Sequence, residues 1–124
     1  MFDVTGHFYN LKLSGSVFKC RSVLEIRRKN SGEENVLPDI IVIMMNPGSS
    51  RPIDKNFKIN TFSKKEYLGI KVRDVVPTRP DNAQYQIMRL MIFNKWNFVR
   101  VLNLSDLRNG NSGKFKTEFI SAMK

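Results

Sequence analysis

The sequence predicts an α/β fold with a mostly parallel central sheet flanked by helices. Three observations lead to this prediction: six consecutive apolar residues at 40–45, an apolar helical pattern within 81–97, and the alternation of strand-like and helix-like segments. The 124 residues include 41% hydrophobic residues, enough for a proper core, and we find neither an internal repeat nor a low-complexity tract. We therefore expect a single domain over 1–124.

The first two predicted strands are residues 18–28 and 40–45. In the first, Leu24 and Ile26 share one face, as in a strand whose other face is in water. The stretch 29–35 contains Asn, Ser and Gly and is predicted to be a turn. The second strand is apolar throughout, so we expect it to be covered on both faces.

The first predicted helix follows Pro80. Asp81 is the expected N-cap, and Gln84 three residues later resembles a capping box. Apolar residues then recur at the spacing of a helix that packs on a sheet, namely Ile87, Met88, Met91 and Ile92. A third strand is expected at 98–104, and a second helix from Lys114.

Residues 49–79 form a long polar stretch that we expect to be a loop without clear structure. From Arg51 to Arg79 this stretch holds eight lysines and arginines against three acids. Loops of this length are usually functional or disordered. The excess of positive charge lies directly after the first predicted ligand-binding turn, so we expect it to contact phosphates.

Two loops are predicted to leave the same edge of the sheet, around Asn46 and from Asn103 to Asn109. Open α/β sheets bind ligands at the carboxyl ends of their strands. Asn46 can donate and accept hydrogen bonds at once, so it can read a base edge or orient a water. Pro47 fixes the turn, and Gly48 allows close approach of the backbone. Alternatively, Asn46 only satisfies loose backbone groups at a turn.

The charge of the chain favours a polyanionic partner. Lysines and arginines number 21 against 11 acids, which gives a formal net charge of +10, and the sequence pI is about 10.1. Such a charge favours nucleic acid through release of counterions. The alternative is an ordinary protein with a solvated basic face.

Several other classes are disfavoured by the composition. No apolar run is long enough for a membrane span, and the N-terminus does not resemble a signal peptide. Cys20 is the single cysteine, which fits a cytoplasmic protein and a buried structural thiol. His7 is the single histidine and is expected to be peripheral, so zinc and Ser-His catalysis have little support. Arg108 and Phe115 break a phosphate-loop pattern. We expect no metal and no cofactor.

Several short blocks occur in the order found in one protein family. They are Met45-Asn46-Pro47-Gly48-Ser49, then Pro77-Thr78, Trp96-Asn97, and Leu102-Asn103-Leu104 through Leu107-Arg108. Over residues 23–112 the chain resembles the bacterial and phage family catalogued as domain of unknown function sixteen forty-three. The ordered set of blocks is more specific than any one of them.

The same layout is similar, more distantly, to the uracil-DNA glycosylase superfamily. This resemblance implies a three-layer α/β fold in which Asn46 lies beside a hydrolytic water, Asn103 reads a flipped base and Gly48 lies under the sugar-phosphate. The late loop with which glycosylases enter the duplex would follow the helix that begins at Lys114. The resemblance therefore implies that the chain is the N-terminal part of a longer domain, or that the site is incomplete.

Three functions remain open. The favoured one is a module that binds nucleic acid or a nucleotide at the carboxyl edge of its sheet. The second is a base-excision glycosylase or related nucleotide hydrolase completed by missing sequence or a partner chain, and the third is a protein-interaction domain. The candidate residues are Asn46 for catalysis and Pro47, Gly48, Ser49, Arg51, Arg79, Asn103 and Arg108 for ligand binding. The sequence does not distinguish DNA from RNA, and an exposed sheet edge would favour a dimer.

Overall fold

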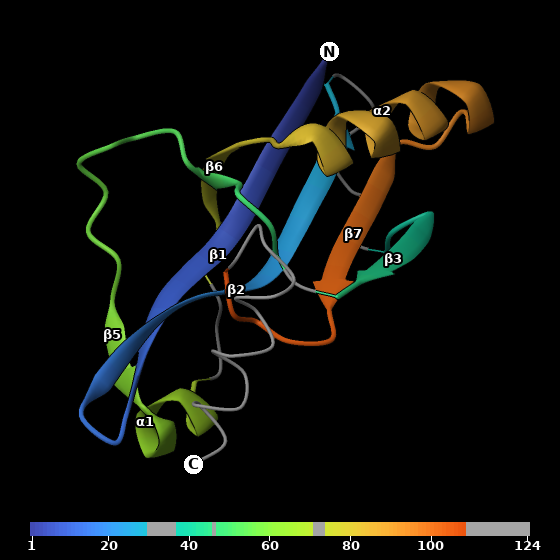
Figure 1. The fold of residues 1–124 in the computed structure, drawn as a ribbon. Helices are drawn as coiled ribbons and strands as arrows, with labels where there is room; N and C mark the ends of the chain where they lie inside the picture. Colours follow the sequence, from blue (N-terminus) through green and yellow to red (C-terminus); the bar gives the residue numbers. More distant parts are fainter. Residues whose placement is uncertain (30–36, 46, 71–73, 109–124) are drawn as a thin grey trace.

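The computed structural model describes residues 1–29, 37–45, 47–70 and 74–108. Within them the strands form a seven-stranded sheet in the order β3-β7-β2-β1-β6-β4, with β5 paired to β1 off this path (Figure 1). The elements are β1 (Phe2–Leu13), β2 (Ser16–Arg28), β3 (Ile40–Met44), β4 (Arg51–Pro52), β5 (Thr61–Ser63), α1 (Lys64–Leu68), β6 (Val76–Arg79), α2 (Asn82–Asn94) and β7 (Phe98–Asn103).

The prediction of a mostly parallel, helix-flanked α/β sheet is wrong. Strands account for 47% of the described residues and helices for 19%. Only β3 with β7 and β1 with β5 pair in parallel, among the described strands, whereas β1/β2, β2/β7, β1/β6 and β4/β6 are antiparallel. The main cause is the N-terminal segment, which forms a long hairpin with β2 and so sets an antiparallel centre.

The hairpin turns at Ser14 and Gly15, both of which have positive φ values, 49° and 82°. Two consecutive left-handed residues match the twist of antiparallel strands, so the chain returns directly on itself. His7 therefore lies in the middle of a sheet strand and is buried. Its expected peripheral position is wrong, because the N-terminal strand is internal to the sheet between β2 and β6.

Three local elements agree with the sequence. The strand at 18–28 lies within β2, and the strand at 98–104 corresponds to β7. Asp81 caps α2: its side chain accepts hydrogen bonds from the backbone of Ala83 and Gln84, and the Gln84 side chain accepts one from the Asp81 backbone in return. The helix ends at Asn94, because the next residue adopts a left-handed conformation.

The core lies between α2 and one face of the sheet (Figure 1). Leu24 and Ile26 of β2 and Val99 and Val101 of β7 pack there with Met91 of α2, and all five are buried. Alternate residues of β2 and β7 point to the opposite face, because successive side chains of a strand alternate. One face of the sheet is thus covered by α2, and the other face carries the alternate residues of β2 and β7, among them Glu25 and Arg100.

β3 is an edge strand, and the expectation that it is covered on both faces is wrong for the described residues. Ile40 and Val42 pack against the core, whereas Ile41 and Ile43 are 50% and 65% exposed. A continuous apolar run does not reveal whether a second layer exists. Burial alternates along β3 because only one of its faces packs against the core.

The stretch 49–79, predicted to lack clear structure, contains β4, β5, α1 and β6. The short helix α1 is held by a capping box in which Ser63 accepts from the Glu66 backbone and Glu66 accepts from the Ser63 backbone. Apart from Lys29, the predicted turn at 29–35 lies outside the described residues, as does the helix from Lys114. No helix in the described part of the chain is long and apolar enough to cross a membrane.

The packing of α2 predicts that Met91→Ala lowers the free energy of unfolding by about 2–5 kcal/mol, because Met91 is fully buried against the sheet. Leu90→Ala is the control, since Leu90 lies one residue away and is 52% exposed; its effect should stay within about 0.5 kcal/mol. Urea denaturation followed by far-UV circular dichroism measures both. Equal losses in the two variants would contradict the assigned face of α2.

Candidate anion-binding site

The carboxyl ends of β3 and β7 lie side by side. Met44 pairs with Asn103 in parallel register, and the backbone N–H groups of Leu104 and Ser105 donate to the carbonyls of Met44 (2.8 Å) and Met45 (3.2 Å). The expectation that the two loops leave the same edge is confirmed for this strand pair. The candidate catalytic residue, number 46 in the chain, lies outside the described residues, so its role stays a prediction.

The segment 47–50 is fastened to the N-terminus of α2. Pro47 is buried, and the Ser49 backbone N–H donates to Asp81 Oδ2 at 3.2 Å. Gly48 has φ +71°, and a Cβ at this position would lie 2.6 Å from Asp81 Oδ2. Glycine is required here because the φ angle is positive and because a larger side chain would collide with the Asp81 carboxylate. The group that approaches the Gly48 backbone closely is therefore the side chain of Asp81.

Arg21 of β2 is a buried charged residue in contact with this segment. Its side chain is fully buried, and its Nη1 donates to Ser50 Oγ. Nε and Nη2 have no hydrogen-bond partner among the described residues. Burial lowers the pKa of Arg21 to about 10, with Arg108 contributing in the same direction and Asp81 opposing. The guanidinium is still protonated at neutral pH, so the structure holds a buried positive charge.

Arg108 lies beside it and shares the same serine. Its Nη2 donates to the Ser50 carbonyl at 3.2 Å, and its backbone N–H donates to the Lys19 carbonyl at 2.9 Å. The guanidinium lies 4.8 Å from the ring centroid of Phe8, and its Nε is buried without a partner in the described part of the chain. Burial lowers the pKa of Arg108. We call Arg21 and Arg108 the arginine pair.

A cavity of about 420 Å³ opens next to the arginine pair. Its lining residues are Asn10, Lys19, Arg51, Pro52, Asp54, Lys55, Phe57, Ile59 and Arg108. Four are basic and one is acidic, so the cavity carries a net positive charge. We call it the basic cleft. Arg108 belongs both to the cleft wall and to the arginine pair, which connects the buried charge to the surface.

The structure separates the other predicted residues. Arg51 and Arg79 are paired across β4 and β6, and both are exposed, but only Arg51 lines the basic cleft. Asn103 ends β7, and both polar atoms of its amide are buried without a hydrogen-bond partner among the described residues. It does not line the basic cleft. Pro47, Gly48 and Ser49 do not line the basic cleft either; they precede Ser50, whose carbonyl accepts from Arg108.

Arg21, Lys19, Asn10 and Ser50 were missed by the sequence interpretation. Arg21 lies in a strand-like run between Cys20 and Ser22, and a strand alternation alone places it in water. The one sequence feature that could have indicated the burial of Arg21 is its position directly after Cys20, which was expected to be buried. Lys19 and Asn10 come to the cleft only through pairing of β1 with β2, in which they are register partners.

The described residues include no group of three or more His, Cys, Asp or Glu side chains that would hold a metal ion. No protein-family model, curated protein or solved structure matches the chain. The resemblance to the domain family sixteen forty-three and to uracil-DNA glycosylases therefore stays a prediction. The three-layer fold that it implied is the part that the structure corrects.

The buried guanidinium of Arg21 is expected to lower the stability of the free protein. Without a bound anion, Arg21→Met should leave the free energy of unfolding unchanged or raise it by about 1–4 kcal/mol, because a buried, incompletely paired charge is replaced by an apolar side chain. Urea denaturation in a buffer free of phosphate and sulfate measures this. Arg89→Met, at an exposed position of α2, should change it by less than about 0.5 kcal/mol. A loss above 2 kcal/mol in Arg21→Met would contradict the incomplete pairing.

Proposed function

We propose that this chain binds nucleic acid through the phosphates, at the basic cleft and the arginine pair. The observation that carries the proposal is the set of buried guanidinium N–H groups without partners among the described residues, on Arg21 and Arg108. Burying such donors costs free energy unless an acceptor meets them. Phosphate oxygens suit a guanidinium because the planar N–H groups match two of them at once.

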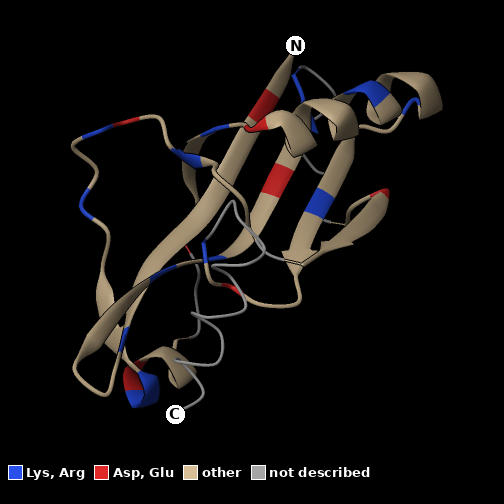
Figure 2. Ribbon diagram, viewed as in Figure 1, with Lys and Arg blue, Asp and Glu red and all other residues tan. Residues whose placement is uncertain are grey.

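The cleft adds the features of a backbone-binding surface. Lys19, Arg51 and Lys55 place further positive charge around Arg108. Phe57 lies among these cations, and aromatic rings beside basic residues serve as stacking platforms for unpaired bases. Figure 2 shows basic residues continuing along the segment between β4 and β5 and onto α1. A single-stranded chain has both phosphates and accessible bases for this combination.

The net charge of +10 supports the same partner at longer range. Such a charge speeds the encounter with a polyanion and adds affinity that falls with salt. The base-excision alternative depends on Asn46 and stays a prediction. The protein-interaction alternative is less well supported, since an acidic peptide does not require a deeply buried guanidinium.

A labelled single-stranded oligonucleotide should bind with an affinity that falls steeply between about 50 and 200 mM salt. The double variant Arg51→Gln, Lys55→Gln should weaken binding and reduce the logarithmic salt slope by about 1 for each side chain that contacts a phosphate. Fluorescence anisotropy measures both. Arg21→Met should weaken binding as well, although its stability is retained.

The matched control is Arg89→Gln, Lys95→Gln, which removes the same charge at exposed positions on α2 and at its C-terminal end, away from the cleft. Its slope should stay close to that of the parent protein. If both double variants lose affinity equally, the net charge rather than the basic cleft accounts for binding. If the parent protein does not bind at 50 mM salt, the proposed function is wrong.

A further inference from the structure

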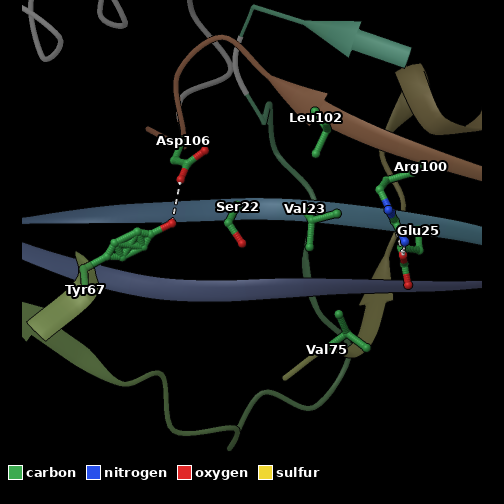
Figure 3. Close-up of a pocket in the computed structure, with 8 residues that line it drawn as sticks. All are labelled: Ser22, Val23, Glu25, Tyr67, Val75, Arg100, Leu102 and Asp106. Carbon is green, nitrogen blue, oxygen red and sulfur yellow. Dashed lines mark hydrogen bonds and ion pairs between the residues drawn. The ribbon is translucent and has the colours of Figure 1, made fainter. Parts of the chain in front are cut away.

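A second cavity, of about 530 Å³, lies on the sheet face that α2 does not cover (Figure 3). Its lining residues are Ser22, Val23, Glu25, Tyr67, Val75, Arg100, Leu102 and Asp106. It carries two carboxylates and one guanidinium, in contrast to the basic cleft. Its charge is therefore different from that of the candidate anion-binding site, so chemistry in this cavity does not depend on the proposed function.

Ser22 reaches this cavity because β2 contains a bulge. The register of β1 with β2 passes from the pair His7 and Val23 to the pair Phe8 and Arg21, which leaves Ser22 as the extra residue. A bulge bends the strand and re-aims the side chain of the extra residue, and bulges are over-represented beside active sites. Figure 3 shows Ser22 projecting between Tyr67 and Val23.

The hydroxyl of Ser22 lies against an imidazole. Ser22 Oγ is 2.6 Å from His7 Nδ1, and His7 is only 7% exposed. A serine that hydrogen-bonds an imidazole nitrogen has the arrangement by which a base activates a hydroxyl nucleophile. His7 is also the single histidine of the chain.

The imidazole is held in place by an aromatic and carboxylate network. Its ring stacks on Tyr9 with centroids 5.5 Å apart. The Tyr9 hydroxyl donates to Asp106 Oδ2 at 2.5 Å, and the Tyr67 hydroxyl donates to the same oxygen at 3.3 Å. Burial and the bond to Asp106 raise the pKa of Tyr9, so its hydroxyl stays protonated. The base is therefore positioned on one side by Tyr9 and on the other by Ser22.

We propose that Ser22 and His7 form a nucleophile and general base that hydrolyse short, uncharged carboxylic esters in this cavity. Ser22 Oγ forms a bond to the ester carbonyl carbon, and its proton passes to His7 Nδ1. The ester C–O bond breaks, and His7 returns the proton to the leaving alcohol. Water then attacks the acyl-serine with the help of His7, releases the carboxylic acid and restores the serine hydroxyl.

The substrate class follows from the cavity walls. Val23, Val75 and Leu102 give an apolar surface for an acyl chain. Arg100 is already paired with Glu25, with both nitrogen–oxygen distances at 3.0 Å, so little cationic attraction is left for an anionic substrate. Asp106 adds a further negative charge. Phosphate esters are disfavoured for this reason, and uncharged esters of short acids fit the volume and the charge.

The test uses an alkyl fluorophosphonate, which phosphonylates activated serines with loss of fluoride. The full chain is incubated with the probe, and the modified peptide is identified by mass spectrometry. Modification of Ser22 and its loss in Ser22→Ala are expected, together with hydrolysis of p-nitrophenyl acetate that depends on Ser22. Ser16→Ala, an exposed serine of the same strand, is the control and should be labelled like the parent protein.

The variant His7→Asn tests whether His7 acts as a general base or only as a hydrogen-bond partner of Ser22. The asparagine amide occupies the position of Nδ1 and can still contact Ser22, but it does not take up the proton. The labelling rate should fall by about 10²-fold or more, which is the usual contribution of a general base, while the thermal unfolding midpoint shows that the fold is kept. The proposal is overturned if the parent protein is not labelled, if another serine is labelled, or if folded His7→Asn reacts at the parent rate. Should His7→Asn not fold, the site of modification in the parent protein decides.

Discussion

The pairing of β1 with β2, and above all the bulge within it, is the constraint on which the rest of the structure depends. The rest of the described sheet is built outward from this hairpin: β7 pairs with β2, β6 and β5 pair with β1, and the edge strands β3 and β4 pair with β7 and β6. Because side chains alternate along a strand, one extra residue exchanges the faces beyond it. Leu24, which follows the bulge in the sequence, packs under α2, and Arg21, which precedes the bulge, contacts Ser50. The bulge therefore puts both side chains on the same face of the sheet. A regular strand would have placed Leu24 and Arg21 on opposite faces.

The same bulge gives the two faces of the sheet their different chemistry. Arg21 is directed to the segment 47–50, which is fastened to α2 through Asp81. Ser22, the extra residue, is directed to the second cavity with His7 as its neighbour. Two adjacent residues thus point to two regions of different charge. The backbone of Arg21 is held on both sides, because Arg21 pairs with Phe8 of β1 and its N–H donates to the Asp106 carbonyl at 2.9 Å.

The arginine pair makes the proposed anion-binding site unfavourable for the stability of the free protein. Burial lowers the pKa of both guanidiniums, and a neighbouring arginine lowers each further: Arg108 acts on Arg21, and Arg51 acts on Arg108. Two contacts of Arg108 partly offset this loss of stability: its guanidinium lies over the Phe8 ring, and its backbone N–H donates to the Lys19 carbonyl. For the proposed binding of an anion this arrangement is favourable, because polar groups that are already in place do not need to reorganise.

The sequence by itself determined the local elements that depend on neighbouring residues. The Asp81 cap of α2, the strands within β2, β3 and β7, and the burial of Cys20 could be read from spacing and turn residues. It also indicated that residues 47–49 and Arg108 belong to one region, since both follow strand ends. The tertiary structure decided what depends on distant pairing: the antiparallel hairpin of β1, the burial of Arg21, and the contact of His7 with Ser22. The hairpin depends on pairing between residues that are distant in the sequence. The positions of Arg21 and Ser22 could not be read from the sequence, because a bulge changes the face of a side chain without leaving a pattern in the residues that flank it.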